Sequence, residues 1–186
     1  LIGVPGLEAM IRHHDVFYRD LTDPVALLRG ETETELADFW PYVFGGEMPA
    51  EQTKTYSDLM ADSQGLVAED TLRMVKLGGV TRLMDVGGGS GAFLSAVQKA
   101  APKLSLRLFD LPDVAPQARA RLGEGVELTS GSFKTDSLPA GADAISLIRV
   151  LYDHSDETVR DLLAKAYTAL PAGGRLIISE PMTGGV

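Results

Sequence analysis

The chain has 186 residues, of which 45% are hydrophobic and 23% charged, a length and composition that allow one substantial core in a folded domain. Its formal net charge is -9 and no run of Lys or Arg could neutralise consecutive phosphates, so we expect no nucleic-acid partner. It has no cysteine, which excludes disulfides and thiolate sites. It also has no apolar run near the ~20 residues of a membrane-spanning helix and no signal pattern at its N-terminus, so we expect a soluble, cytoplasmic protein with no transmembrane segment.

Residues 1–80 are predicted to be mostly helical, because their apolar side chains recur at spacings of three and four residues. We interpret this range as a helical linker that also contributes to a substrate pocket. In its amphipathic second half, Gly65 is expected to bend or divide a helix, and Tyr56 and Met60 are our candidate substrate residues. An aromatic cluster lies just before this helix, and it is either a core patch, which we favour, or a wall for an apolar substrate. It consists of Phe39, Trp40, Tyr42, Val43 and Phe44.

From residue 81 to residue 186, short apolar strands alternate with helices, which is typical of a parallel α/β sheet. The clearest helix is predicted over Asp156 to Leu170, where apolar residues fall on one stripe. Ser155 can cap its first turn and Pro171 follows its end. The expected fold class is therefore α/β, with a helical segment before the sheet. Five strands are predicted, at Arg82–Val86, Ser105–Phe109, Val126–Ser130, Ala144–Ile148 and Arg175–Ser179.

A glycine-rich segment follows the first predicted strand and leads into a helix. Gly87, Gly89 and Gly91 let the backbone turn sharply and approach a ligand without a Cβ, while the helix start presents unpaired N–H groups to that ligand. Asp110 ends the second strand, 25 residues after Asp85, close to the spacing at which a carboxylate binds the hydroxyls of a ribose. These features predict a Rossmann-like sheet that binds a nucleoside-containing cofactor.

Two classes of cofactor fit this segment. Gly87, Gly89 and Ala92 satisfy the fingerprint of dinucleotide sites, so an NAD-dependent oxidoreductase is one alternative. Asp85 favours a cationic cofactor instead. A carboxylate directly before the loop would repel a pyrophosphate, but it would attract the ammonium group of S-adenosyl-L-methionine, directly or through water.

The spacing Asp85-x-Gly87-x-Gly89-x-Gly91 is that of class I methyltransferases. Residues from about 56 to 181 resemble the O-methyltransferase family that includes caffeate-type, acetylserotonin-type and bacterial polyketide and carotenoid enzymes. Further motifs match in the same order: Asp110-Leu111-Pro112 resembles the acid that binds the ribose, Gly131-Ser132-Phe133 the adenine side, Arg149 to Asp156 the segment usually written with His-Asp-Trp, and Ile177 to Pro181 the next strand and its acid. Within the family, the wording of this His-Asp-Trp segment is most similar to the enzymes of carotenoid biosynthesis that methylate hydroxyneurosporene or demethylspheroidene.

The resemblance implies that residues 81–186 are a class I methyltransferase domain that binds S-adenosyl-L-methionine. Its methyl group would go to a hydroxyl of a small lipophilic molecule, such as a hydroxycarotenoid. Ser132 stands where the family usually has an Asp beside the adenine, so that contact would become weaker or pass to the backbone of Ser132 and Phe133. The implied cofactor-binding residues are Asp85, Gly87, Gly89, Gly91, Asp110, Leu111, Ser132, Phe133 and, through its backbone, Arg149.

The catalytic position departs from the family. Tyr152 occupies the place of the usual catalytic histidine, and a phenol with a pKa of about 10 is a poor base near neutral pH. His154 is a candidate substitute if the segment is an extended turn, since side chains two residues apart then share a side, whereas on a helix they would diverge. Its alternative is a structural role at the start of the next helix. Asp153 and Glu180 are the other ionisable candidates, and Glu180 either orients the base or acceptor or is simply solvated.

The extent of the chain also departs from the family. It begins with Leu1 rather than Met and stops soon after the fifth predicted strand, so we expect it to be truncated at both ends, with doubtful activity of its own. The parent protein is expected to be a homodimer through an N-terminal domain missing here. Because Tyr152 replaces the usual base, a non-catalytic S-adenosylmethionine-binding module is a further alternative. No metal is expected, since His13 and His14 lack a spaced set of ligand residues.

Overall fold

The computed structural model describes residues 7–39 and 64–183. The chain divides into two compact units, Leu1–Ser63 and Gln64–Val186. The helix over 64–74 buries Ala68 in the same cluster as the sheet residue Leu83. The unit that contains the sheet therefore starts earlier in the chain than residue 81, where the sequence pattern changes. Among the described residues, no helix combines the length and the apolar character needed to cross a membrane.

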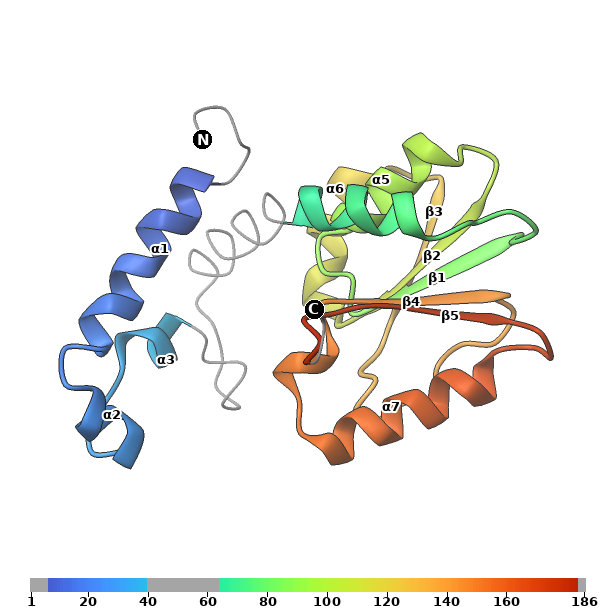
Figure 1. Cartoon of the computed structure of the whole chain (residues 1–186). Helices are drawn as coiled ribbons and strands as arrows, with labels where there is room; N and C mark the ends of the chain where they lie inside the picture. Colours follow the sequence, from blue (N-terminus) through green and yellow to red (C-terminus); the bar gives the residue numbers. More distant parts are fainter. Residues whose placement is uncertain (1–6, 40–63, 184–186) are drawn as a thin grey trace. The chain divides into compact units, whose positions relative to one another are not determined.

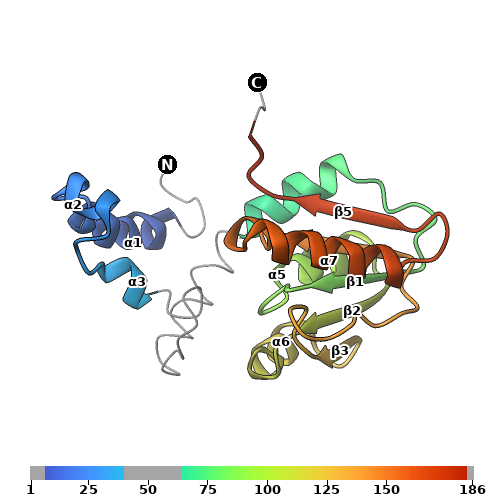
Figure 2. The same cartoon turned by 90° about the horizontal axis from the view of Figure 1, so that it is seen from below.

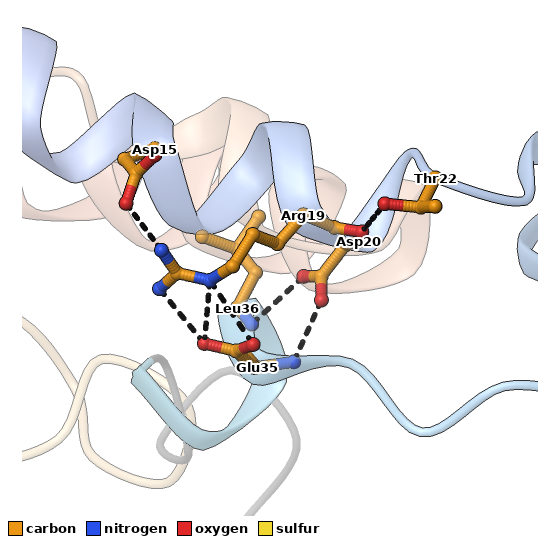
Figure 3. Close-up of polar contacts among 6 residues, drawn as sticks. All are labelled: Asp15, Arg19, Asp20, Thr22, Glu35 and Leu36. Atoms are coloured by element: carbon orange, nitrogen blue, oxygen red, sulfur yellow. Dashed lines mark hydrogen bonds and ion pairs between the residues drawn. The ribbon is translucent and has the colours of Figure 1, made fainter.

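The first unit contains α1 (Leu7–Asp20), α2 (Pro24–Arg29) and α3 (Glu35–Phe39), as predicted for a mostly helical segment. Asp20 at the end of α1 accepts hydrogen bonds from the backbone N–H groups of Glu35 and Leu36, both at 2.9 Å, and so caps the first turn of α3. Arg19 pairs with Asp15 and with Glu35, the latter at 2.9 Å (Figure 3). The end of α1 and the start of α3 are thus joined by charged and capping contacts.

The second unit is built on five parallel strands in the order β3-β2-β1-β4-β5 (Figures 1 and 2). All five predicted strands are confirmed, and β2 extends one residue further than predicted, to Asp110. Because the strands are parallel, their carboxyl ends lie at one edge of the sheet, and the strand order reverses between β1 and β4. The strands are β1 (Arg82–Val86), β2 (Ser105–Asp110), β3 (Val126–Ser130), β4 (Ala144–Ile148) and β5 (Arg175–Ser179).

Helices cover both faces of this sheet (Figure 1). The helix over 64–74, α5 (Ala92–Ala100) and α6 (Ala115–Leu122) bury one face, and α7 (Asp156–Ala169) buries the other. Alternate strand residues divide between the two cores, with Leu83 in the first and Met84 in the second, as the two-residue period of a strand requires. Single turns of 3₁₀ helix, η2 (Pro112–Val114) and η3 (Leu151–Asp153), follow β2 and β4. The predicted cap of α7 is confirmed, since Ser155 accepts from the N–H of Thr158 at 3.4 Å.

Gly91 gives a test of this packing. It is the N-cap of α5 with φ 79°, and a Cβ added to it would lie 2.5 Å from Cδ1 of Leu122 in the core. Gly173 also has φ 79°, but a Cβ there would meet no atom within 4 Å. We expect Gly173→Ala to lower the free energy of unfolding by about 1–2 kcal/mol through backbone strain. Gly91→Ala should cost roughly 1–3 kcal/mol more because it also overpacks the core.

Urea denaturation of both variants, followed by circular dichroism, measures this difference. Equal losses would show that Leu122 does not pack against the start of α5.

Candidate active site

The parallel sheet brings the predicted site residues to a single edge. Gly87 follows β1, Asp110 ends β2, Gly131 follows β3, Arg149 follows β4 and Glu180 follows β5. Open α/β sheets bind ligands outside the carboxyl ends of their strands, at the point where the strand order reverses. The glycine loop after β1 and the segment after β4 flank that point.

Asp110 is bonded directly to the glycine loop. Its Oδ2 accepts the N–H of Gly89 at 2.7 Å, and its Oδ1 accepts the N–H of Leu111 at the same distance. Burial raises the pKa of Asp110, while these two N–H groups oppose that rise. Gly89 has φ 56°, and a Cβ there would meet no atom within 4 Å. The loop is thus held by the acid at the tip of β2, and beside Gly89 it leaves free space.

One wall of the site forms where side chains from two loops meet the backbone of a third. A Cβ added to Gly87, which has φ 68°, would lie 3.1 Å from Cγ2 of Val150 and 3.7 Å from Cε1 of Phe133. The ring of Phe133 in turn meets the ring of His154 edge to face, with 5.2 Å between their centroids. Segments that follow β1, β3 and β4 are therefore in contact. Two of the predicted residues, Phe133 and His154, are direct neighbours.

Asp85 lies under the glycine loop rather than on its open side. Its side chain is fully buried, and its Oδ1 accepts a 2.6 Å hydrogen bond from Ser146, its register partner on β4. Within the described residues its Oδ2 has no hydrogen-bond partner, and a Cβ on Gly88 would collide with that oxygen. Asp85 therefore makes no direct approach to the open side of the loop. The middle glycine, which the motif spacing treats as variable, is required here by the carboxylate beneath it.

The turn after β3 satisfies its own polar groups. The N–H of Ser132 donates to Oδ2 of Asp136 at 2.8 Å, and the carbonyl of Phe133 accepts from Nζ of Lys165 at 2.7 Å. The sequence interpretation assigned the adenine contact to the backbone of Ser132 and Phe133. This N–H group and this carbonyl group are already hydrogen-bonded within the protein.

The segment after β4 is clamped by Glu180. Its Oε1 accepts the backbone N–H groups of Val150 at 2.6 Å and Leu151 at 2.8 Å, and its Oε2 is buried with no hydrogen-bond partner among the described residues. Arg149 has φ 57°, which is uncommon for a residue other than glycine and recurs at functional sites. Glu180 is thus neither a solvated strand end nor a group aimed only at an acceptor, because one oxygen fixes this segment.

The segment that carries Tyr152 and His154 is not one extended turn. Tyr152 lies in the 3₁₀ turn η3, and His154 follows that turn as its extended C-cap. Tyr152 is 48% exposed, whereas His154 is partly buried against Phe133. Burial, and then the charge of Lys134, lower the pKa of His154. Burial raises the pKa of Asp153, with Arg149 opposing the rise and Glu180 adding to it.

Other sequence candidates lie outside the described residues. They are Tyr56, Met60 and the aromatic residues from Trp40 to Phe44. The sequence interpretation missed two contacts, that of Ser146 with Asp85 and that of Lys165 with Phe133. Ser146 could have been noticed, because it is the one polar residue in the apolar strand β4. Nothing in the sequence pointed to Lys165.

A parallel sheet in this order, with a glycine loop after β1 that hydrogen-bonds an acid at the tip of β2, defines a Rossmann-like protein with a site for a nucleoside cofactor. More narrowly, the chain belongs to the O-methyltransferase domain family, which matches residues 18–185. The match runs through all five motifs named above.

Individual relatives agree with the family. Demethylspheroidene O-methyltransferase of Cereibacter sphaeroides is 62% identical over 99% of this chain and 50% of its own length. The protein of the same name from Rhodobacter capsulatus is 59% identical over 99% of this chain and 47% of its own length. This chain therefore spans about half the length of these curated relatives.

Solved structures support the fold. The S-adenosylmethionine-dependent methyltransferase SibL, in its apo form, has a TM-score of 0.73 and 27% identity, over 93% of this chain and 54% of that one. Human N-acetylserotonin methyltransferase in complex with SAM has a TM-score of 0.63 and 25% identity, over 77% of this chain and 46% of that one. The class I methyltransferase sheet predicted from the sequence is confirmed.

Asp85 gives a test of the buried carboxylate. Burial raises its pKa to about 7, and the charge of Asp110 adds to that rise. Between about pH 4 and pH 7, only the folded chain keeps this proton, so the free energy of unfolding falls as the pH rises through that window. Asp85→Asn is neutral throughout. We expect the free energy of unfolding of Asp85→Asn, relative to that of the wild type, to rise by roughly 2 kcal/mol between about pH 5 and pH 8.

Urea unfolding at both pH values checks this, with Asp113→Asn, at an exposed acid of η2, as the matched control. A difference between Asp85→Asn and the wild type that does not change with pH would contradict the assignment.

Proposed function

We propose that the protein to which this chain belongs is an S-adenosyl-L-methionine-dependent O-methyltransferase that methylates a hydroxyl group of a carotenoid. The main observation behind the proposal is the 2.7 Å hydrogen bond between Gly89 and Asp110, which joins the glycine loop to an acid at the position where such sheets bind a ribose. Identities of 62% and 59% to two demethylspheroidene O-methyltransferases support the acceptor class. The relative solved with SAM supports the cofactor, and no relative named above is an oxidoreductase.

The residues present fit that cofactor. Each carboxylate oxygen has two lone pairs, so Asp110 can accept a ribose hydroxyl while it keeps the N–H of Gly89. The free space beside Gly89 lets the ligand approach the backbone. The ring of Phe133 offers an apolar surface beside Gly87 for the adenine. Asp85 acts from beneath the loop, through Gly88, and not by touching the ligand.

Methyl transfer from a sulfonium to an alcohol needs alignment and a proton acceptor. S-adenosyl-L-methionine, held by Asp110 and the glycine loop, would supply an activated methyl group whose carbon–sulfur bond breaks to leave a neutral thioether, so the acceptor hydroxyl would have to lose its proton to a base. His154 is suited to this role, because a lowered pKa leaves its imidazole neutral and able to accept. Tyr152 is more exposed and carries a phenol. Glu180 acts through the backbone of the segment that carries both residues.

Three further assignments belong to this proposal. Tyr56 and Met60 contact the lipophilic substrate, the active protein is cytoplasmic, and it is a homodimer. Exposed apolar side chains on the first unit favour a partner surface there, with Ile11 63% and Tyr18 69% exposed on α1 and Leu28 88% exposed on α2.

The cofactor assignment is tested by calorimetry with S-adenosylhomocysteine. We expect Asp110→Asn to weaken binding by about 10-fold to 100-fold, the loss of one or two hydrogen bonds to a charged group. Asp113→Asn changes a nearby exposed acid and should leave the affinity unchanged. Equal affinity of Asp110→Asn and the wild type would show that the ribose does not bind at the end of β2.

The proton acceptor is tested by methyl transfer to a hydroxycarotenoid, with the full-length protein. We expect His154→Gln to lower kcat by about 10²-fold to 10⁴-fold and Tyr152→Phe to change it little. The reverse pattern would make Tyr152 the base. No transfer by the full-length wild type that still binds S-adenosylhomocysteine would favour the non-catalytic binding module.

A further inference from the structure

A lysine of α7 reaches across to the turn that follows β3. Nζ of Lys165 donates to the carbonyl oxygen of Phe133 at 2.7 Å and to that of Lys134 at 3.2 Å, and it pairs with Asp161 of its own helix at 2.8 Å. Three oxygens therefore surround an ammonium group that has three hydrogens to donate. The Lys165 side chain is 20% exposed, which is unusual for a residue type that normally lies in water.

The carbonyl group that Lys165 holds belongs to Phe133, whose ring forms part of the wall of the site. Phe133 lies beside Gly87 on one side and meets the ring of His154 at 5.2 Å between centroids. A carbonyl fixed at 2.7 Å restricts the position of its own residue and hence of its ring. Lys165 thereby restrains a contact with the glycine loop and a contact with the candidate base.

The other partner in the ring contact is attached to the same helix. His154 directly precedes Ser155, the N-cap of α7, and Lys165 lies further along that helix. A helix is stiff over this length, so α7 holds His154 at its start and the Phe133 turn through Lys165. The two rings are then kept together by a closed loop of contacts.

We propose that Lys165 is a positioning residue of the methyl-transfer site, which acts by fixing the Phe133 turn so that its ring covers His154 and closes one side of the glycine loop. The inference rests on the proposed function, because His154 affects the reaction only if it accepts the proton. Lys165 itself touches neither the glycine loop nor His154 in the described contacts, so its effect must pass through the turn.

The charged groups around His154 predict how a loosened turn would show itself. Lys134, which comes from the turn, is the charged group that acts on His154, whereas Arg149 and Glu180 act on its neighbour Asp153. Burial and the charge of Lys134 both lower the pKa of His154. Release of the turn would expose the imidazole and free Lys134 to move away, and both changes would return that pKa toward its ordinary value of about 6.5.

The test compares three lysine variants by NMR titration of His154 in this chain, with the ring signal assigned by His154→Gln. Lys165→Met keeps the length of the side chain and removes its hydrogen bonds, and we expect His154 to titrate near its ordinary value. Lys165→Arg keeps donors and should restore most of the wild-type behaviour. Lys99→Met changes an exposed lysine of α5 and should change nothing.

A double-mutant cycle with Phe133→Ala separates positioning from the direct charge of Lys165. If the lysine acts through the ring, Lys165→Met has a smaller effect on the titration of His154 once Phe133 is absent, because only the movement of Lys134 is then left. The affinity for S-adenosylhomocysteine should fall several-fold in Lys165→Met as well. Circular dichroism confirms that each variant is folded.

An unchanged titration of His154 in Lys165→Met, or an equal shift in the Phe133→Ala background, overturns the inference. The titration needs no substrate and no turnover. A failure of the full-length protein to transfer a methyl group would therefore count against the proposed function alone, while a failed titration would count against Lys165.

Discussion

The site depends on the 2.7 Å hydrogen bond from the N–H of Gly89 to Asp110. It joins the loop after β1 to the tip of β2, so the acid and the glycine backbone have one fixed spacing before any ligand arrives. A second acid works from below, where Asp85 leaves room only for a glycine at position 88. The loop is therefore held between two carboxylates, and its conformation is set by the sheet rather than by the ligand.

Holding a loop in this way has an electrostatic cost. Burial raises the pKa values of both Asp85 and Asp110, since a carboxylate loses hydration when it leaves water. Ser146 offsets part of this cost for Asp85, and two backbone N–H groups do so for Asp110. A cationic ligand nearby would favour the ionised forms further. An acidic loop support of this kind suits a sulfonium cofactor better than a pyrophosphate.

The sequence predicted most of the fold, because each signal was local. Short apolar runs that alternate with helical segments located all five strands, and the stripe from Val159 to Leu170 with its Ser155 cap located α7 to within one residue of its end. Asp110 was found by its spacing from Asp85. The contacts that could not be predicted join distant positions. Ser146 meets Asp85 through strand register, and Lys165 meets Phe133 through the packing of a helix on a turn 32 residues away.

The segment after β4 shows why a catalytic role cannot be transferred to a neighbouring residue from its position in the sequence alone. The sequence left open whether Tyr152 and His154 share a side, as in an extended turn, or diverge, as on a helix. In the structure Tyr152 lies in the 3₁₀ turn η3 and is exposed, whereas the ring of His154 packs against Phe133. If His154 accepts the proton, the acceptor hydroxyl must lie within hydrogen-bond reach of its imidazole, on a side of that ring that Phe133 does not cover.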